Sequence, residues 1–69
     1  MEDCSRVAEV VKKAVEASRA FYLITSDIIS YEVYERILNA VVESLNRPRE
    51  DVERCVMQTL GEMGLYVAF

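Results

Sequence analysis

The sequence contains no histidine, only two glycines and only one proline. Histidine is the side chain most often used as a general base and as a metal ligand, so its absence removes the usual basis for both kinds of site. No glycine-rich segment is present that could hold a phosphate group. So little glycine and proline also excludes a disordered or collagen-like chain. We therefore expect a folded protein without enzymatic activity, cofactor, metal ion or small-molecule substrate.

Long apolar runs are also missing. The longest candidate, AFYLI at 20–24, stops at Thr25 and is far shorter than the roughly 20 residues that span a membrane. The first 20 residues contain acidic side chains, which secretory leaders and transit peptides lack. These acidic residues are Glu2, Asp3, Glu9 and Glu16. The sequence therefore predicts a soluble, cytoplasmic protein that does not contact a membrane.

The chain combines an acidic charge with a large apolar share. Its net charge is −4, and 52% of its 69 residues are hydrophobic. An acidic protein is repelled by phosphate backbones unless its basic residues cluster. A chain this short buries only about 60% of the surface that its unfolded form exposes. Because so small a core leaves apolar side chains uncovered, we expect this protein to bind a second copy of itself or another protein.

Apolar residues recur at spacings of three and four in three segments, as they do in amphipathic helices. We expect helices over about 3–23, 30–45 and 48–63, with Asp3 as a candidate N-cap of the first. Ser26, Asp27 and Ser30 are candidate N-caps of the second. The expected apolar faces are Val7, Val10, Val11, Ala14, Ala17, Ser18 and Phe21; Tyr34, Ile37, Leu38, Val41, Val42 and Leu45; and Val52, Cys55, Val56, Thr59, Leu60 and Met63.

The third helix has the clearest boundaries. Asn46 tolerates the left-handed conformation that ends a helix, and Pro48 is favoured where the next one begins. Gly64 fits the left-handed position after the last turn, which brings Leu65 against Leu60. The remaining tail, to Phe69, is rich in strand-forming residues, and a lone strand must pair or pack. We predict one domain over 1–69: an all-α, three-helix bundle with a short extended or β tail at 65–69.

Most charged residues fit a solvated helix surface. Glu followed by Lys or Arg four residues later stabilises a helix, and five of the eight basic residues occupy such positions. The pairs are Glu2–Arg6, Glu9–Lys13, Glu32–Arg36, Glu43–Arg47 and Glu50–Arg54. Lys12, Arg19 and Arg49 are left over, and they do not cluster in the sequence. No basic patch for nucleic acid is evident.

The two cysteines, Cys4 and Cys55, are far apart and match no metal-binding spacing. The pattern favours two reduced thiols, because a buried cysteine acts as a small apolar side chain. The alternative is a Cys4–Cys55 disulfide, which would stabilise a small core but requires an oxidising compartment or a thermophile.

The stretch ILNAVVESLNRPREDVERCVMQTLGEMGLYVAF, from Ile37 to Phe69, resembles the second half of a winged helix-turn-helix domain. In that superfamily a helix leads through a turn into a recognition helix, which ends in a Gly-Leu or Gly-Ile step before a wing strand. The resemblance implies that 48–63 is the recognition helix and that Arg49, Arg54 and Gln58 are its DNA contacts.

Two functional hypotheses follow. The first is a small, non-enzymatic protein-interaction or assembly module, either self-associating or a subunit of a larger complex. Its expected interface combines apolar residues of the tail with two tyrosines near the start of the second helix. These residues are Leu65, Tyr66, Val67, Phe69, Tyr31 and Tyr34. The alternative, implied by the resemblance, is a DNA-binding transcriptional regulator.

Overall fold

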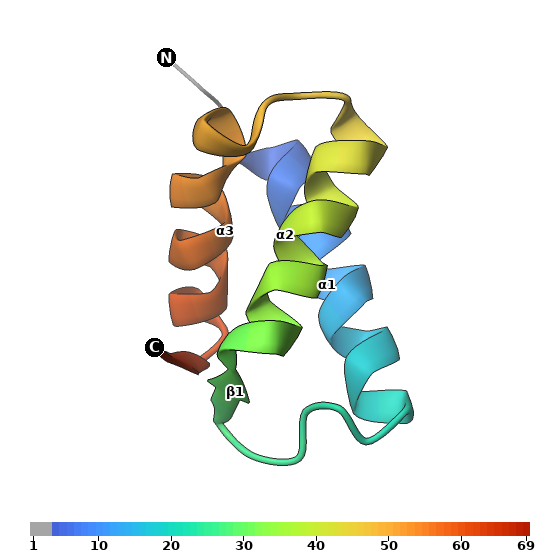
Figure 1. Cartoon of the computed structure of the whole chain (residues 1–69), viewed down its shortest axis with the longest axis vertical. Coiled ribbons are helices and arrows are strands. Elements are labelled where there is room, and N and C mark those ends of the chain that lie inside the picture. Colours follow the sequence, from blue (N-terminus) through green and yellow to red (C-terminus); the bar gives the residue numbers. More distant parts are fainter. Residues whose placement is uncertain (1–3) are drawn as a thin grey trace.

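Three helices and two short strands make up the computed structural model, which describes residues 4–69. They follow in the order α1 (Ser5–Ala20), β1 (Ile28–Ser30), α2 (Tyr31–Leu45), α3 (Arg49–Glu62) and β2 (Tyr66–Ala68). The helices pack side by side, and both strands lie at one end of the bundle (Figure 1). The predicted three-helix bundle with an extended C-terminal tail is confirmed, and the tail forms a strand.

The core is filled mainly by aliphatic side chains at the spacings that the sequence indicated. The buried residues include Val7, Val11, Val15, Ile37, Leu38, Val41, Val52, Val56 and Leu60. Three expectations for the first helix are wrong. Phe21 is 77% exposed because α1 ends before it, and Ala17 is also exposed. Val15, which was outside the expected face, is buried.

Two of the helices end in the same backbone motif. At the end of α3 the Leu65 N–H donates to the Leu60 carbonyl at 2.9 Å, and the Gly64 N–H donates to that of Gly61 at 3.0 Å. Gly64 has φ +78°, as a Schellman ending requires. The predicted contribution of Gly64 and Leu65 to this ending is confirmed.

The first helix ends three residues earlier than predicted, because Tyr22 takes the position that Gly64 holds after α3. The Leu23 N–H donates to the Ser18 carbonyl at 2.8 Å, and the Tyr22 N–H donates to that of Arg19 at 3.1 Å. Tyr22 has φ 61°, a conformation that costs a residue with a side chain roughly 1–2 kcal/mol. A tyrosine at this position gives no recognisable helix-stop signal in the sequence.

The N-terminal caps are only partly as expected. Of the three candidates before α2, Ser30 is the cap, and its Oγ accepts a hydrogen bond from the Val33 N–H at 3.3 Å. Asn46 ends α2 with φ 52°, as predicted. The proposed cap Asp3 lies outside the described residues, and Cys4 occupies the capping position of α1 without a side-chain hydrogen bond.

The two strands form a small parallel sheet, in which β1 was not predicted. Ile28 is in register with Tyr66, Ile29 with Val67 and Ser30 with Ala68. The Tyr66 N–H also donates to the Asp27 carbonyl at 2.8 Å. The segment read as a break between helices therefore contains the strand with which the apolar tail pairs.

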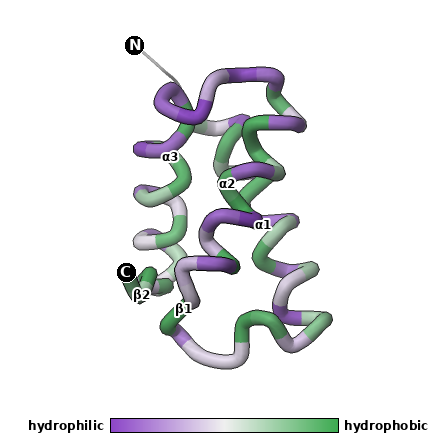
Figure 2. Tube along the Cα trace, viewed as in Figure 1, coloured by the Kyte–Doolittle hydropathy of each residue, from purple (hydrophilic) through white to green (hydrophobic). Residues whose placement is uncertain are grey.

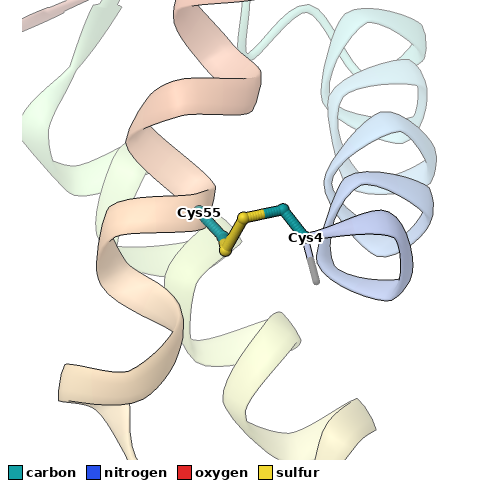
Figure 3. Close-up of a disulfide and its surroundings, with 2 residues drawn as sticks. All are labelled: Cys4 and Cys55. Atoms are coloured by element: carbon teal, nitrogen blue, oxygen red, sulfur yellow. A yellow bond between two sulfur atoms is a disulfide. The ribbon is translucent and has the colours of Figure 1, made fainter. Parts of the chain in front are cut away.

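A disulfide joins the start of α1 to the middle of α3. Cys4 at the start of α1 is bonded to Cys55 in the middle of α3, and their Cα atoms are 5.4 Å apart (Figure 3). The favoured prediction of two reduced thiols is therefore wrong, and the alternative, a Cys4–Cys55 disulfide, is confirmed. Periodicity placed Cys55 on the core face, but it could not show that Cys4 lies next to it.

The two glycines should respond to substitution in opposite directions. Gly64→Ala places a side chain at φ +78° and should lower the free energy of unfolding by about 1 kcal/mol. Gly61→Ala, within α3 and with open space around the added Cβ, should raise it by about 0.5–1 kcal/mol. Urea unfolding of both variants measures this difference. Equal effects of the two substitutions would contradict the assigned helix ending.

Candidate functional site

The large apolar side chains that remain exposed gather at one end of the bundle. They come from the segment after α1, from β1, from the first turn of α2 and from β2 and the residue after it (Figure 1). We call this surface the apolar end, and its residues are Phe21, Tyr22, Leu23, Ile28, Tyr31, Tyr66 and Phe69. Met57, on α3, is exposed outside it. The opposite end, at the connection between α2 and α3, is mainly hydrophilic (Figure 2).

Three aromatic rings from distant parts of the chain meet at the apolar end. The ring centroids of Tyr31 and Tyr34 are 5.8 Å apart, those of Tyr31 and Phe69 are 5.8 Å apart, and those of Tyr34 and Phe69 are 6.0 Å apart. These distances are typical of favourable tilted and edge-on ring pairs. The pairing of β2 with β1 brings Phe69 to the start of α2, so the tail and the two tyrosines predicted for one interface do lie together.

The six residues predicted for a partner interface divide into exposed and buried groups. Tyr66 and Phe69 are 68% and 82% exposed, and Tyr31 is 43% exposed. Leu65 and Tyr34 are each only 3% exposed and belong to the core. Val67, in β2, is partly buried against the core. A partner could therefore contact Tyr66, Phe69 and Tyr31 directly. Leu65 and Tyr34 are buried in the core and could not be contacted.

Four residues of the apolar end were not selected from the sequence. Phe21, Tyr22 and Leu23 were placed at the end of the first helix, and Ile28 in the break before the second. Ile28 is 63% exposed and sits opposite Tyr66 in the sheet. The run of three large apolar residues after Ala20 was the available signal, because a helix that stops there leaves them without a core to cover them.

A network of charged and polar side chains lies beside the aromatic rings. Arg49 Nη2 lies 2.8 Å from Glu35 Oε2, and Arg49 Nε donates to Glu53 Oε2 at 3.2 Å. The Tyr31 hydroxyl donates to Glu35 Oε1 at 3.1 Å. These hydrogen bonds to two carboxylates raise the pKa of Arg49. Arg49, which was left over when charges were paired along the helices, instead joins α3 to α2.

Of the helix-surface pairs predicted from spacing, several do not form. Between residues 4 and 69 no ion pair closes between Glu9 and Lys13, between Glu32 and Arg36, or between Glu50 and Arg54. Glu2–Arg6 includes a residue outside the described part. Exposed helix pairs are worth only a few tenths of a kcal/mol, so these side chains are not held in contact.

The three residues named as possible DNA contacts are not equally available. Arg54 and Gln58 are exposed on α3, whereas Arg49 is engaged by Glu35 and Glu53. A depression of about 250 Å³ beside them is lined by Arg49, Glu50 and Glu53. The carboxylates there oppose the approach of a phosphate backbone.

No family model, no curated protein and no solved structure matches this chain. The resemblance to winged helix-turn-helix domains therefore stays a prediction. Within residues 4–69 no cluster of cysteine and carboxylate side chains is placed to hold a metal ion. None of the helices in this part of the chain has the length and apolar character needed to cross a membrane.

Tyr34 should make the fold sensitive to alkaline pH. Its burial, followed by the negative charge of Glu53, raises the pKa of its phenol above the usual value of 10.0. In the unfolded chain this tyrosine loses its proton first, so stability is retained below about pH 10 and falls as the pH rises above it. Urea unfolding between about pH 9 and 11 should show that the free energy of unfolding falls less in Tyr34→Phe than in the unsubstituted protein. If the free energy of unfolding fell equally steeply with pH in both proteins, this effect of Tyr34 would be contradicted.

Proposed function

We propose that this chain is a small, non-enzymatic assembly module in which the apolar end of one copy packs against the apolar end of a second copy. The observation that supports the proposal is the collection of exposed apolar side chains at this end. Scattered exposed apolar residues are ordinary, but large apolar patches are typical of protein interaction sites.

The area of the apolar end suits an interface between two small proteins. Five of its residues are aromatic, and their exposed fractions lie between 43% and 83%. Because a buried aromatic side chain removes about 150–250 Å² from water, these five side chains together could bury on the order of 500–900 Å² per copy. A standard interface takes about 800 Å² from each partner.

The backbone supports the same surface. The sequences of β1 and β2, Ile28–Ser30 and Tyr66–Ala68, contain no charged residue or proline, the features that usually prevent an open strand edge from pairing. Tyr22 is 83% exposed although its left-handed conformation is unfavourable for a large side chain. Strain of this kind is common where a side chain is held for binding.

A second copy is the partner that these features favour. An aromatic and aliphatic surface is self-complementary, because it needs no opposite charge on the other molecule, and a two-fold interface must be self-complementary. A chain of this length also has a small core of its own and gains stability from association.

The disulfide between Cys4 and Cys55 is relevant to the compartment in which this protein functions. The sequence predicted a cytoplasmic location, whereas disulfides persist mainly in oxidising compartments and in thermophiles. The bond between Cys4 and Cys55 favours such a setting over the cytoplasm. The proposed setting is therefore one in which this bond stays closed.

Substitution of two neighbouring side chains tests the self-association directly. Ile28→Thr with Tyr66→Thr removes apolar surface but retains good strand formers. It should raise the dissociation constant of the dimer at least about 100-fold. Light scattering after size exclusion, over a range of concentrations, should then give the 7.9 kDa of one chain where the unsubstituted protein gives twice that mass.

Met57→Ser is the matched control, because Met57 is also exposed but lies on α3. It should leave the mass unchanged. A monomeric unsubstituted protein at all concentrations, or an equal loss of mass in the Met57→Ser variant, would overturn the proposal.

A further inference from the structure

The turn that follows α1 is held in a fixed backbone conformation. Each backbone N–H of residues 21–24 donates to a carbonyl of α1, at distances between 2.8 and 3.3 Å. The last of these residues, Ile24, also has its side chain buried in the core. The turn is therefore tied to the fold at both of its ends. A binding segment that is already ordered loses little conformational entropy when a partner covers it.

This turn lacks both features that stabilise the matching turn after α3. In the turn after α3, Gly64 occupies the left-handed position, and the next residue, Leu65, is only 3% exposed. After α1 the left-handed position holds Tyr22, and the next residue, Leu23, is 46% exposed. The residue against which Leu23 would pack in such a turn is Ser18, which is not apolar. Glycine in place of the tyrosine would therefore make the fold more stable.

No interaction of the Tyr22 side chain within the described chain offsets this cost. Tyr22 is 83% exposed, more than any other residue of the apolar end. Among residues 4–69 its ring pairs with no other ring, and its hydroxyl forms no hydrogen bond. Residues that break a local rule without a gain for the fold are expected at functional sites. A contact outside the chain would explain why a tyrosine stands here.

We infer that Tyr22 is the anchor residue of the self-association interface, the side chain whose burial contributes most to the binding of a second copy. This inference rests on the proposed function, because it takes the second copy as the partner that covers the apolar end. Tyrosine is among the residue types that most often dominate the binding energy of an interface. Its ring buries a large area, and its hydroxyl can remain hydrated at the edge. At this position the chain has affinity at the expense of fold stability.

Tyr22→Gly tests the inference, because it should change fold stability and association in opposite directions. At a concentration at which neither protein associates, the melting temperature should rise by at least about 3 °C, since glycine adopts the left-handed conformation freely. The dissociation constant of the dimer, measured by sedimentation equilibrium, should rise at least about 30-fold. Tyr66→Thr, elsewhere in the apolar end, should weaken association without raising the melting temperature.

Tyr22→Phe is the matched control, because it keeps the ring and the left-handed conformation and removes only the hydroxyl. It should leave the melting temperature unchanged and the dissociation constant within about threefold of the original. An unchanged dissociation constant in Tyr22→Gly would overturn this inference but not the proposed function. A lower melting temperature in Tyr22→Gly would also overturn it, since the tyrosine would then serve the fold. A monomeric unsubstituted protein would overturn both.

Discussion

The pairing of β2 with β1 is the constraint on which the functional surface depends. It joins the segment after α3 to the segment before α2, in the register Ile28 with Tyr66. Because of this pairing, Leu65 is drawn into the core and Phe69 reaches the rings of Tyr31 and Tyr34. The same pairing leaves Ile28 and Tyr66 side by side and exposed. A strand of three residues is weak alone, so the sheet and the core beneath it support each other.

The parts of the fold that could be predicted from the sequence are those set by local rules. Helix ends depend on only a few adjacent residues. The residue types therefore predicted the N-cap Ser30 and the left-handed positions of Asn46 and Gly64. The end of α1 could not be predicted, since Tyr22 adopts a conformation that tyrosine rarely takes. The strand β1 was missed, and the disulfide was only the second alternative for the two cysteines. In both cases the partners are distant in sequence and are brought close only by the whole fold.

The same distinction between local and long-range features explains which residues of the candidate site could be predicted. Composition singled out the aromatic tail and two tyrosines, but only three-dimensional packing decides that Tyr34 and Leu65 are covered while Tyr66 is not. The spacing of charges along helices left Arg49 without a partner, whereas the structure places Glu35 of another helix beside it. The two ends of the bundle also differ. The disulfide lies at the end where α1 begins, and the apolar end surrounds the sheet at the other.

The central claim is that the sheet forms within one chain and that its apolar end then contacts the same end of a second chain. The most direct measurement is an isotope-filtered NMR experiment on a mixture of labelled and unlabelled protein, which detects only contacts between chains. The claim predicts intermolecular signals from the rings of Tyr66 and Phe69 to residues such as Ile28 of the other copy. Intermolecular signals confined to Met57 and its neighbours on α3, or none at high concentration, would contradict it.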